Sequence, residues 1–138
     1  MIRFGRREFL AGVGGAAAAG LIGPGLGLVP LGCAADPGLE RALVALLSDP
    51  AGSAAVGREW LAQAPGETDA EQLVEALAGE RRAAWRALAN GDADALRRAV
   101  RERHVEDFAA GRVTSVRGWV LSQTEARLCA LAELRASA

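Results

Sequence analysis

The chain has few side chains that could do chemistry. Among 138 residues it contains one histidine, His104, two cysteines, Cys33 and Cys129, and no tyrosine. A nucleophilic enzyme needs a serine or cysteine beside a base and an orienting acid. The only ready combinations place His104 with Cys129 or with Ser122, and neither lies in a recognisable nucleophile motif. We therefore predict a non-catalytic chain, with a small hydrolase or thiol enzyme as the alternative.

The chain also has few residues that could form a site for a metal, a cofactor or a nucleic acid. One histidine and two cysteines are too few for a zinc finger, an iron–sulfur cluster or a haem attachment site. No glycine-rich phosphate loop follows a strand pattern. The 16 basic residues face 17 acids, for a net charge of −1, so no basic field favours DNA or RNA. We expect no cofactor, metal ion or nucleic acid to bind.

The histidine and the second cysteine have structural explanations. Four residues at four-residue steps form a helical stripe: Leu96, Val100, His104 and Phe108. Such a stripe favours a hydrogen-bonded structural imidazole. Cys129 lies among leucines, which favours a small buried hydrophobe. A disulfide between Cys33 and Cys129 is not expected.

The first 35 residues have the layout of an export signal. Arginines at positions 3, 6 and 7 precede an uncharged run, rich in glycine and alanine, that reaches Cys33. The run Arg6-Arg7-Glu8-Phe9-Leu10 resembles the twin-arginine pattern, in which two arginines are followed by any residue, phenylalanine and leucine. The resemblance implies that Arg6, Arg7, Phe9 and Leu10 bind the twin-arginine translocon. We predict a signal peptide over residues 1–35 and a periplasmic or cell-envelope location.

Three fates of this segment remain open. Cleavage before Asp36 would use the small residues of Cys33-Ala34-Ala35. Lipidation would instead make Cys33 the acylated first residue, although its flank Pro30-Leu31-Gly32 departs from the lipoprotein pattern. Retention would leave the segment as a membrane anchor. We expect contact with a membrane only through the signal or a lipid on Cys33.

Residues 36–138 predict a small all-α domain. Helical spacing of apolar residues gives helices over residues 37–48, 53–63, 68–91 and 92–111, and one that starts after Ser122. Gly79 is a possible break in the third helix. Thr68-Asp69-Ala70-Glu71 and Ser122-Gln123-Thr124-Glu125 are capping boxes that begin the third and last helices. The prediction is a bundle of about five helices with one short extended arm.

The arm over residues 113–121 is the exception to the helical pattern. It is β-branched and aromatic and contains Gly118, so it predicts an extended arm or a small hairpin. Trp119 and Leu121 either fold back onto the bundle or meet a partner chain, since aromatic and arginine side chains are favoured at interfaces. The candidate partner-binding residues are Trp119, Leu121 and Arg127.

Four blocks of the sequence resemble a family of short exported proteins. They are Arg6–Leu10, Val56–Leu61, Asp107-Phe108 with Gly111-Arg112, and the most specific one, Gly118–Leu131. In these blocks the chain is similar to the gluconate 2-dehydrogenase subunit 3 group, the small subunits of gluconate, sorbitol and fructose dehydrogenase complexes. The resemblance implies an accessory subunit that binds a larger, flavin-dependent catalytic subunit.

The export route agrees with such a role. Twin-arginine signals carry folded proteins, typically with their cofactor in place, whereas this domain has few groups that could hold one. We therefore expect the signal to export and stabilise a bound catalytic subunit that has no signal of its own. The alternative is a free-standing periplasmic helical domain, with a binding or structural role and no dehydrogenase partner.

Overall fold

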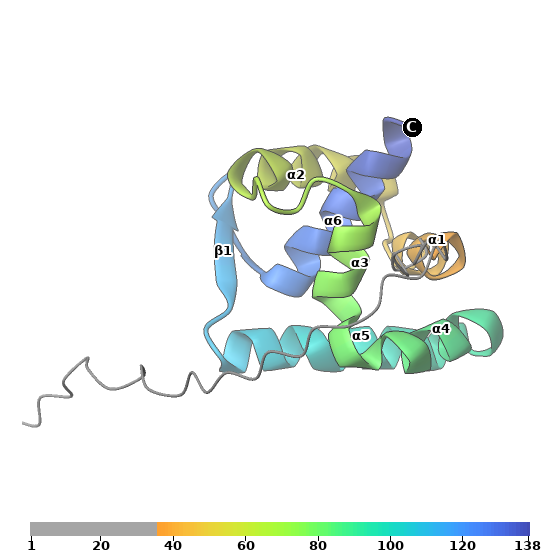
Figure 1. The fold of residues 1–138 in the computed structure, drawn as a ribbon. Coiled ribbons are helices and arrows are strands. Elements are labelled where there is room, and N and C mark those ends of the chain that lie inside the picture. The colour runs from red at the N-terminus through yellow and green to blue at the C-terminus, as the bar shows by residue number, and fades with distance from the viewer. Residues whose placement is uncertain (1–35) are drawn as a thin grey trace, which may run out of the picture. The chain divides into compact units, whose positions relative to one another are not determined.

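The computed structural model describes residues 36–138, which form an all-α bundle with one two-stranded sheet (Figure 1). The predicted fold class is confirmed. The predicted signal, including Arg6, Arg7, Phe9, Leu10 and Cys33, lies outside the described residues. The described elements are α1 (Pro37–Val44), α2 (Pro50–Gln63), α3 (Ala70–Ala78), a 3-10 turn (Gly79–Arg81), α4 (Arg82–Gly91), α5 (Ala93–Ala109), β1 (Val113–Val116), β2 (Trp119–Ser122) and α6 (Gln123–Ala136).

Aspartate side chains begin four of the helices. Asp36, Asp49, Asp69 and Asp92 each accept a hydrogen bond from a backbone N–H in the first turn of α1, α2, α3 and α5. A proline occupies the first turn of α1 and of α2, where it loses no intrahelical hydrogen bond. The Asp49 cap therefore starts α2 at Pro50, ahead of the predicted start at residue 53.

The capping box predicted at Thr68 does not form, and the N-cap of α3 lies one residue later. Asp69 is the N-cap of α3 and accepts from Gln72 N at 2.8 Å, because aspartate caps better than threonine. The Gln72 side chain reaches back to the backbone N–H of Thr68 at 2.7 Å, and Glu71 binds Arg82 instead. The box from Ser122 to Glu125 is confirmed in full.

Two other helix boundaries differ from the spacing pattern. α1 ends at Val44 and not at residue 48, because the N–H groups of Leu46 and Leu47 bond three residues back and tighten the chain before Asp49. The possible break at Gly79 is confirmed: its φ is +50°, and the predicted 68–91 helix becomes α3, the 3-10 turn and α4.

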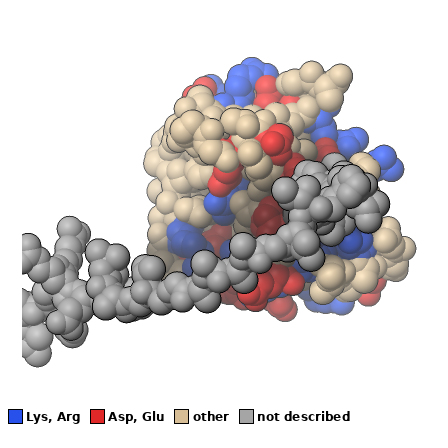
Figure 2. All heavy atoms as spheres, in the orientation of Figure 1, with Lys and Arg blue, Asp and Glu red and all other residues tan. Residues whose placement is uncertain are grey.

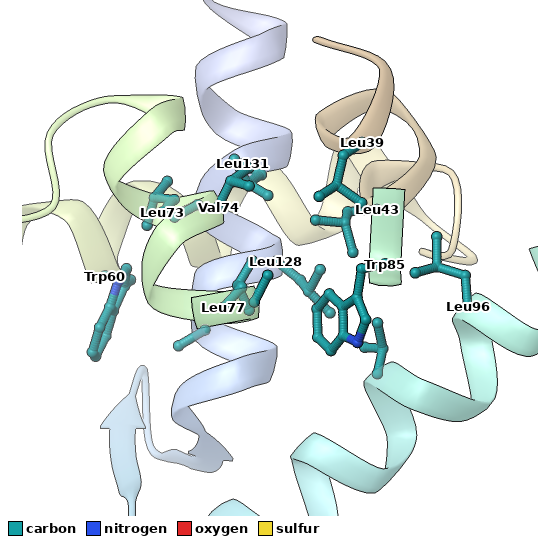
Figure 3. Close-up of a cluster of buried hydrophobic side chains, with 14 of the residues drawn as sticks. Leu39, Leu43, Trp60, Leu73, Val74, Leu77, Trp85, Leu96, Leu128 and Leu131 are labelled. Carbon is teal, nitrogen blue, oxygen red and sulfur yellow. The ribbon is translucent and has the colours of Figure 1, made fainter. Parts of the chain in front are cut away.

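The core surrounds α6, which contacts α1, α2, α3 and α5. Trp85 of α4 is its largest fully buried side chain, and leucines from four helices share the same cluster (Figure 3). Leu128 and Leu131 of α6 are buried there, whereas Leu134 is partly buried. The last helix is therefore the central support of the domain.

The closest helix contact is between α2 and α6. A Cβ atom built on Gly57 of α2 would lie 2.0 Å from the carbonyl oxygen of Cys129 and 2.7 Å from the backbone nitrogen of Ala130. Small side chains flank the crossing, because Ala54 on α2 and Ala126 on α6 are also buried. The two backbones meet directly at this point, and only glycine fits at position 57.

The arm of residues 113–121 is a hairpin. β1 and β2 pair antiparallel, with Val113 opposite Ser122 and Val116 opposite Trp119. Arg117 and Gly118 form the two-residue turn, and their φ angles of 53° and 84° are those of a type I′ turn. The hairpin alternative of the sequence prediction is therefore confirmed.

A second glycine turn connects the hairpin to α5. Gly111 has a φ of +69° and donates its N–H to Phe108 O at 3.2 Å. The N–H of Arg112 bonds Asp107 O at 2.8 Å, which completes a Schellman motif. The chain thus leaves the end of α5 in a fixed direction.

Candidate functional site

The exposed large apolar side chains of residues 36–138 are confined to one stretch of the chain. They are Val105, Phe108, Val113, Trp119 and Val120. The surface around the hairpin is mostly uncharged in Figure 2, while basic and acidic side chains alternate over much of the rest. A concentration of exposed apolar groups in one stretch of the chain is typical of an interaction surface. The hairpin and the end of α5 are the candidate site.

The hairpin presents two of its candidate partner-binding residues, Trp119 and Leu121, differently. Leu121 packs partly buried against the core, and Val116 on the same face is fully buried. Trp119 lies beside the turn at the end of the hairpin and is 73% exposed. Leu121 thus folds back onto the bundle and Trp119 does not, so Trp119 is available for the predicted contact with a partner.

Arg127 has an internal partner. Its Nη2 lies 2.7 Å from Glu67 Oε1, and the side chain is 16% exposed. The indole nitrogen of Trp60 donates to the same carboxylate at 3.3 Å. This cluster fastens the loop after α2 to α6. Partner binding by Arg127 stays a prediction, and this residue lies in α6, outside the hairpin and the end of α5.

The structure brings His104 and Ser122 together without forming an exposed catalytic pair. His104 Nδ1 lies 3.0 Å from Ser122 Oγ and 3.4 Å from Glu125 Oε2. Ser122 is fully buried, and its Oγ already accepts the N–H of Glu125 as the cap of α6. A cleft of about 370 Å³ lies beside His104, but neither Ser122 nor Cys129 lines it. The cluster supports the start of α6.

Cys129 is a partly buried free thiol. Burial raises the pKa of this thiol, against a smaller lowering by a hydrogen bond with Ser53. It is therefore protonated and a weak nucleophile at neutral pH. Within residues 36–138 no cluster of histidine, cysteine, aspartate and glutamate could hold a metal ion. No helix in this range is long and apolar enough to cross a membrane.

Asp107 is the polar centre of the site and was missed as a buried residue by the sequence analysis. It is 1% exposed. Its Oδ2 accepts from the backbone N–H and the hydroxyl of Thr124 at 2.8 and 2.6 Å, and its Oδ1 accepts from Arg112 Nε at 2.7 Å. The helical spacing of Asp107 from Val100 places both on the buried face of α5, which is the signal that could have found it.

Asp107 thereby ties three segments together. It lies in α5, Arg112 precedes β1, and Thr124 is in the first turn of α6. The base of the hairpin is held between the end of one helix and the start of another. The candidate site is therefore an exposed hairpin end on a rigid base.

No family model, curated protein or solved structure matches the chain. The functional interpretation therefore depends on the hairpin, its charged base and the sequence patterns.

Acid should destabilise the domain through its paired carboxylates. Burial raises the pKa of Asp107, but the hydrogen bonds from Thr124 and Arg112 outweigh it, and the pKa lies below its ordinary value. Hydrogen bonds from Arg58 and Arg86 lower the pKa of Glu133 and Asp36. A lowered pKa adds stability above the unfolded-state pKa and loses it as pH falls through the folded-state pKa.

We therefore expect a constant melting temperature from about pH 7 to 5 and a progressive fall below about pH 4, where unfolded aspartate and glutamate bind protons. Thermal unfolding followed by circular dichroism measures the melting temperature at each pH. Added salt should reduce the contribution of the exposed pairs and spare that of Asp107. A melting temperature that is unchanged or higher at acid pH would contradict this assignment.

Proposed function

We propose that this chain is a non-catalytic accessory subunit that escorts an exported oxidoreductase. The observation that carries the proposal is the twin-arginine pattern Arg6-Arg7-Glu8-Phe9-Leu10 at the start of a small chain. A route for folded, cofactor-loaded proteins is of little use to a domain with one histidine and one thiol. The signal therefore serves a larger catalytic subunit that is bound to the domain in the cytoplasm.

Two further observations support a bound partner. Trp119 and Val120 are 73% and 63% exposed, and exposed aromatic side chains are frequent centres of protein interfaces. The Gly118–Leu131 block, in which the resemblance to the dehydrogenase small subunits is most specific, begins in the hairpin turn and continues through β2 into α6. The partner implied by that resemblance is a flavin-dependent dehydrogenase.

Replacing both Arg6 and Arg7 with lysine tests the proposal. We expect a flavin-dependent dehydrogenase that co-purifies with the signal-bearing chain to stay in the cytoplasm, because the translocon no longer binds the signal of its escort. Dehydrogenase activity in periplasmic and cytoplasmic fractions measures the result, and a periplasmic protein exported in the unfolded state is the control.

Unchanged export of the dehydrogenase in the double variant would overturn the proposal. Recovery of the domain as a stable monomer, with no bound dehydrogenase, would favour the free-standing periplasmic domain instead.

A further inference from the structure

The outer edge of β1 carries backbone groups without partners. Gln123 N donates to Arg112 O at 3.1 Å, and Val116 and Trp119 flank the two-residue turn. Bonded and non-bonded pairs alternate along an antiparallel ladder, so Val113 and Ser115 are the β1 residues in non-bonded pairs. Their N–H and C=O groups point away from β2.

Nothing in residues 36–138 hydrogen-bonds these outward groups. The side chains of Val113 and Ser115 are exposed as well. The opposite edge is more occupied, because Ser122 N donates to Glu125 Oε2 at 2.9 Å. Among the described residues, β1 is therefore the more open edge of the sheet, although the outward groups of Val120 on β2 also have no partner there. An open strand edge is a template for another extended chain.

We propose that β1 is the docking edge for an extended segment of the catalytic subunit, which adds to the hairpin as a third strand. This inference rests on the proposed function and names the mode of contact. Backbone hydrogen bonds to Val113 and Ser115 supply the pairing. The exposed Trp119 and Val120 lie on the adjacent strand and enlarge the contact.

The charges around β1 specify the chemistry of that segment. The strand itself is uncharged, and arginines flank it at positions 112 and 117. Arg117 has no ion-pair partner among residues 36–138, and both Nη groups of Arg112 are free of hydrogen bonds there. A segment with aspartate or glutamate beside a short β-branched run fits this edge.

The same charges disfavour a second copy of this chain. Antiparallel pairing of two β1 strands through their outward residues would place Val113 of each copy opposite Ser115 of the other, and Arg117 opposite Gly111, next to Arg112. Like charges at both ends oppose such pairing, and the strand has only four residues over which to offset them.

A substitution that removes a backbone N–H of β1 distinguishes pairing along the strand edge from contact through side chains. Ser115→Pro removes the outward N–H and places a ring on the edge, but breaks no hydrogen bond of the hairpin. Ser115→Val is the matched control, because it keeps the N–H and suits a strand. In a titration of the full chain with the purified dehydrogenase, we expect Ser115→Pro to weaken binding about ten-fold or more and Ser115→Val to retain it.

Three results would overturn the inference. One is a folded Ser115→Pro chain that binds as tightly as the wild type. Another is a loss of binding in Trp119→Ala with none in Ser115→Pro, which would mean that side chains alone make the contact. The third is a dimer of the wild-type chain in sedimentation that Ser115→Pro abolishes, which would mean that a second copy occupies the edge.

Hydrogen exchange on the wild-type chain keeps the test decisive if Ser115→Pro does not fold. We expect the amides of Val113 and Ser115 to exchange at least about ten-fold more slowly in the complex than in the free chain. Equal rates would overturn edge pairing. Unchanged export of the dehydrogenase in the Arg6 and Arg7 variant would refute the escort function itself. If export depends on these arginines but the β1 amides exchange equally fast in the complex and in the free chain, only the docking edge is refuted.

Discussion

Gly57→Ala is expected to lower the free energy of unfolding by about 2–4 kcal/mol, one of the largest effects of a single methyl group in this domain. The new Cβ would lie 2.0 Å from the Cys129 carbonyl oxygen and 2.4 Å from its carbon. Both atoms belong to the backbone of α6, so no side chain can rotate away. The helices must separate, and the contacts of α2 with the central helix are lost along its length.

Urea unfolding followed by circular dichroism measures the loss, and Gly91→Ala is the matched control. Gly91 ends α4, and a Cβ built on it meets nothing within 4 Å. The control should be neutral or stabilise the domain by about 0.5 kcal/mol, because alanine restricts the unfolded chain. If the two variants were equally stable, the direct backbone contact between α2 and α6 would be wrong.

Asp107→Ala is expected to lower the free energy of unfolding by about 3–5 kcal/mol, because it leaves the buried N–H and hydroxyl of Thr124 without an acceptor. Asp107→Asn should cost less. Its amide oxygen can still accept from Thr124, but the amide nitrogen would then face the donor Arg112 Nε. Urea unfolding of both variants measures the difference.

An exposed aspartate on the same helix provides the control. Asp94 pairs with Arg97 at 2.7 Å and is 78% exposed, so Asp94→Asn should change stability by less than about 0.5 kcal/mol. In Thr124→Val the hydroxyl is absent, and the additional cost of Asp107→Ala should be smaller in that background. Strict additivity of the two substitutions would contradict the hydrogen bond between them.

The sequence predicted those parts of the fold that local chemistry determines. Apolar spacing located the helices, Gly79 marked a break, and the Ser122 capping box formed as expected, since each depends on residues within a few positions. The Thr68 box did not form because two adjacent residues could both cap the helix, and Asp69, the stronger one, does.

Long-range contacts could not be predicted in the same way. Asp107 is buried because Thr124, 17 residues away, supplies its donors, and Gly57 is required because α6 crosses it. For the candidate site, the pattern of residues 113–121 indicated an apolar arm. Which of Trp119 and Leu121 faces the bundle depends on how the hairpin sits on α5 and α6, and spacing alone does not determine that.

The fixed base of the hairpin has a consequence for the speed and affinity of association. Asp107, Arg112 and Thr124 hold β1 in extended form before any partner arrives. The entropy of ordering this strand is lost during folding, so it does not oppose complex formation. Such preorganisation favours association limited by encounter, with no disorder-to-order step on this side. A weakened Asp107 cluster would then slow binding of the proposed partner by loosening β1, without altering any group that we propose to touch it.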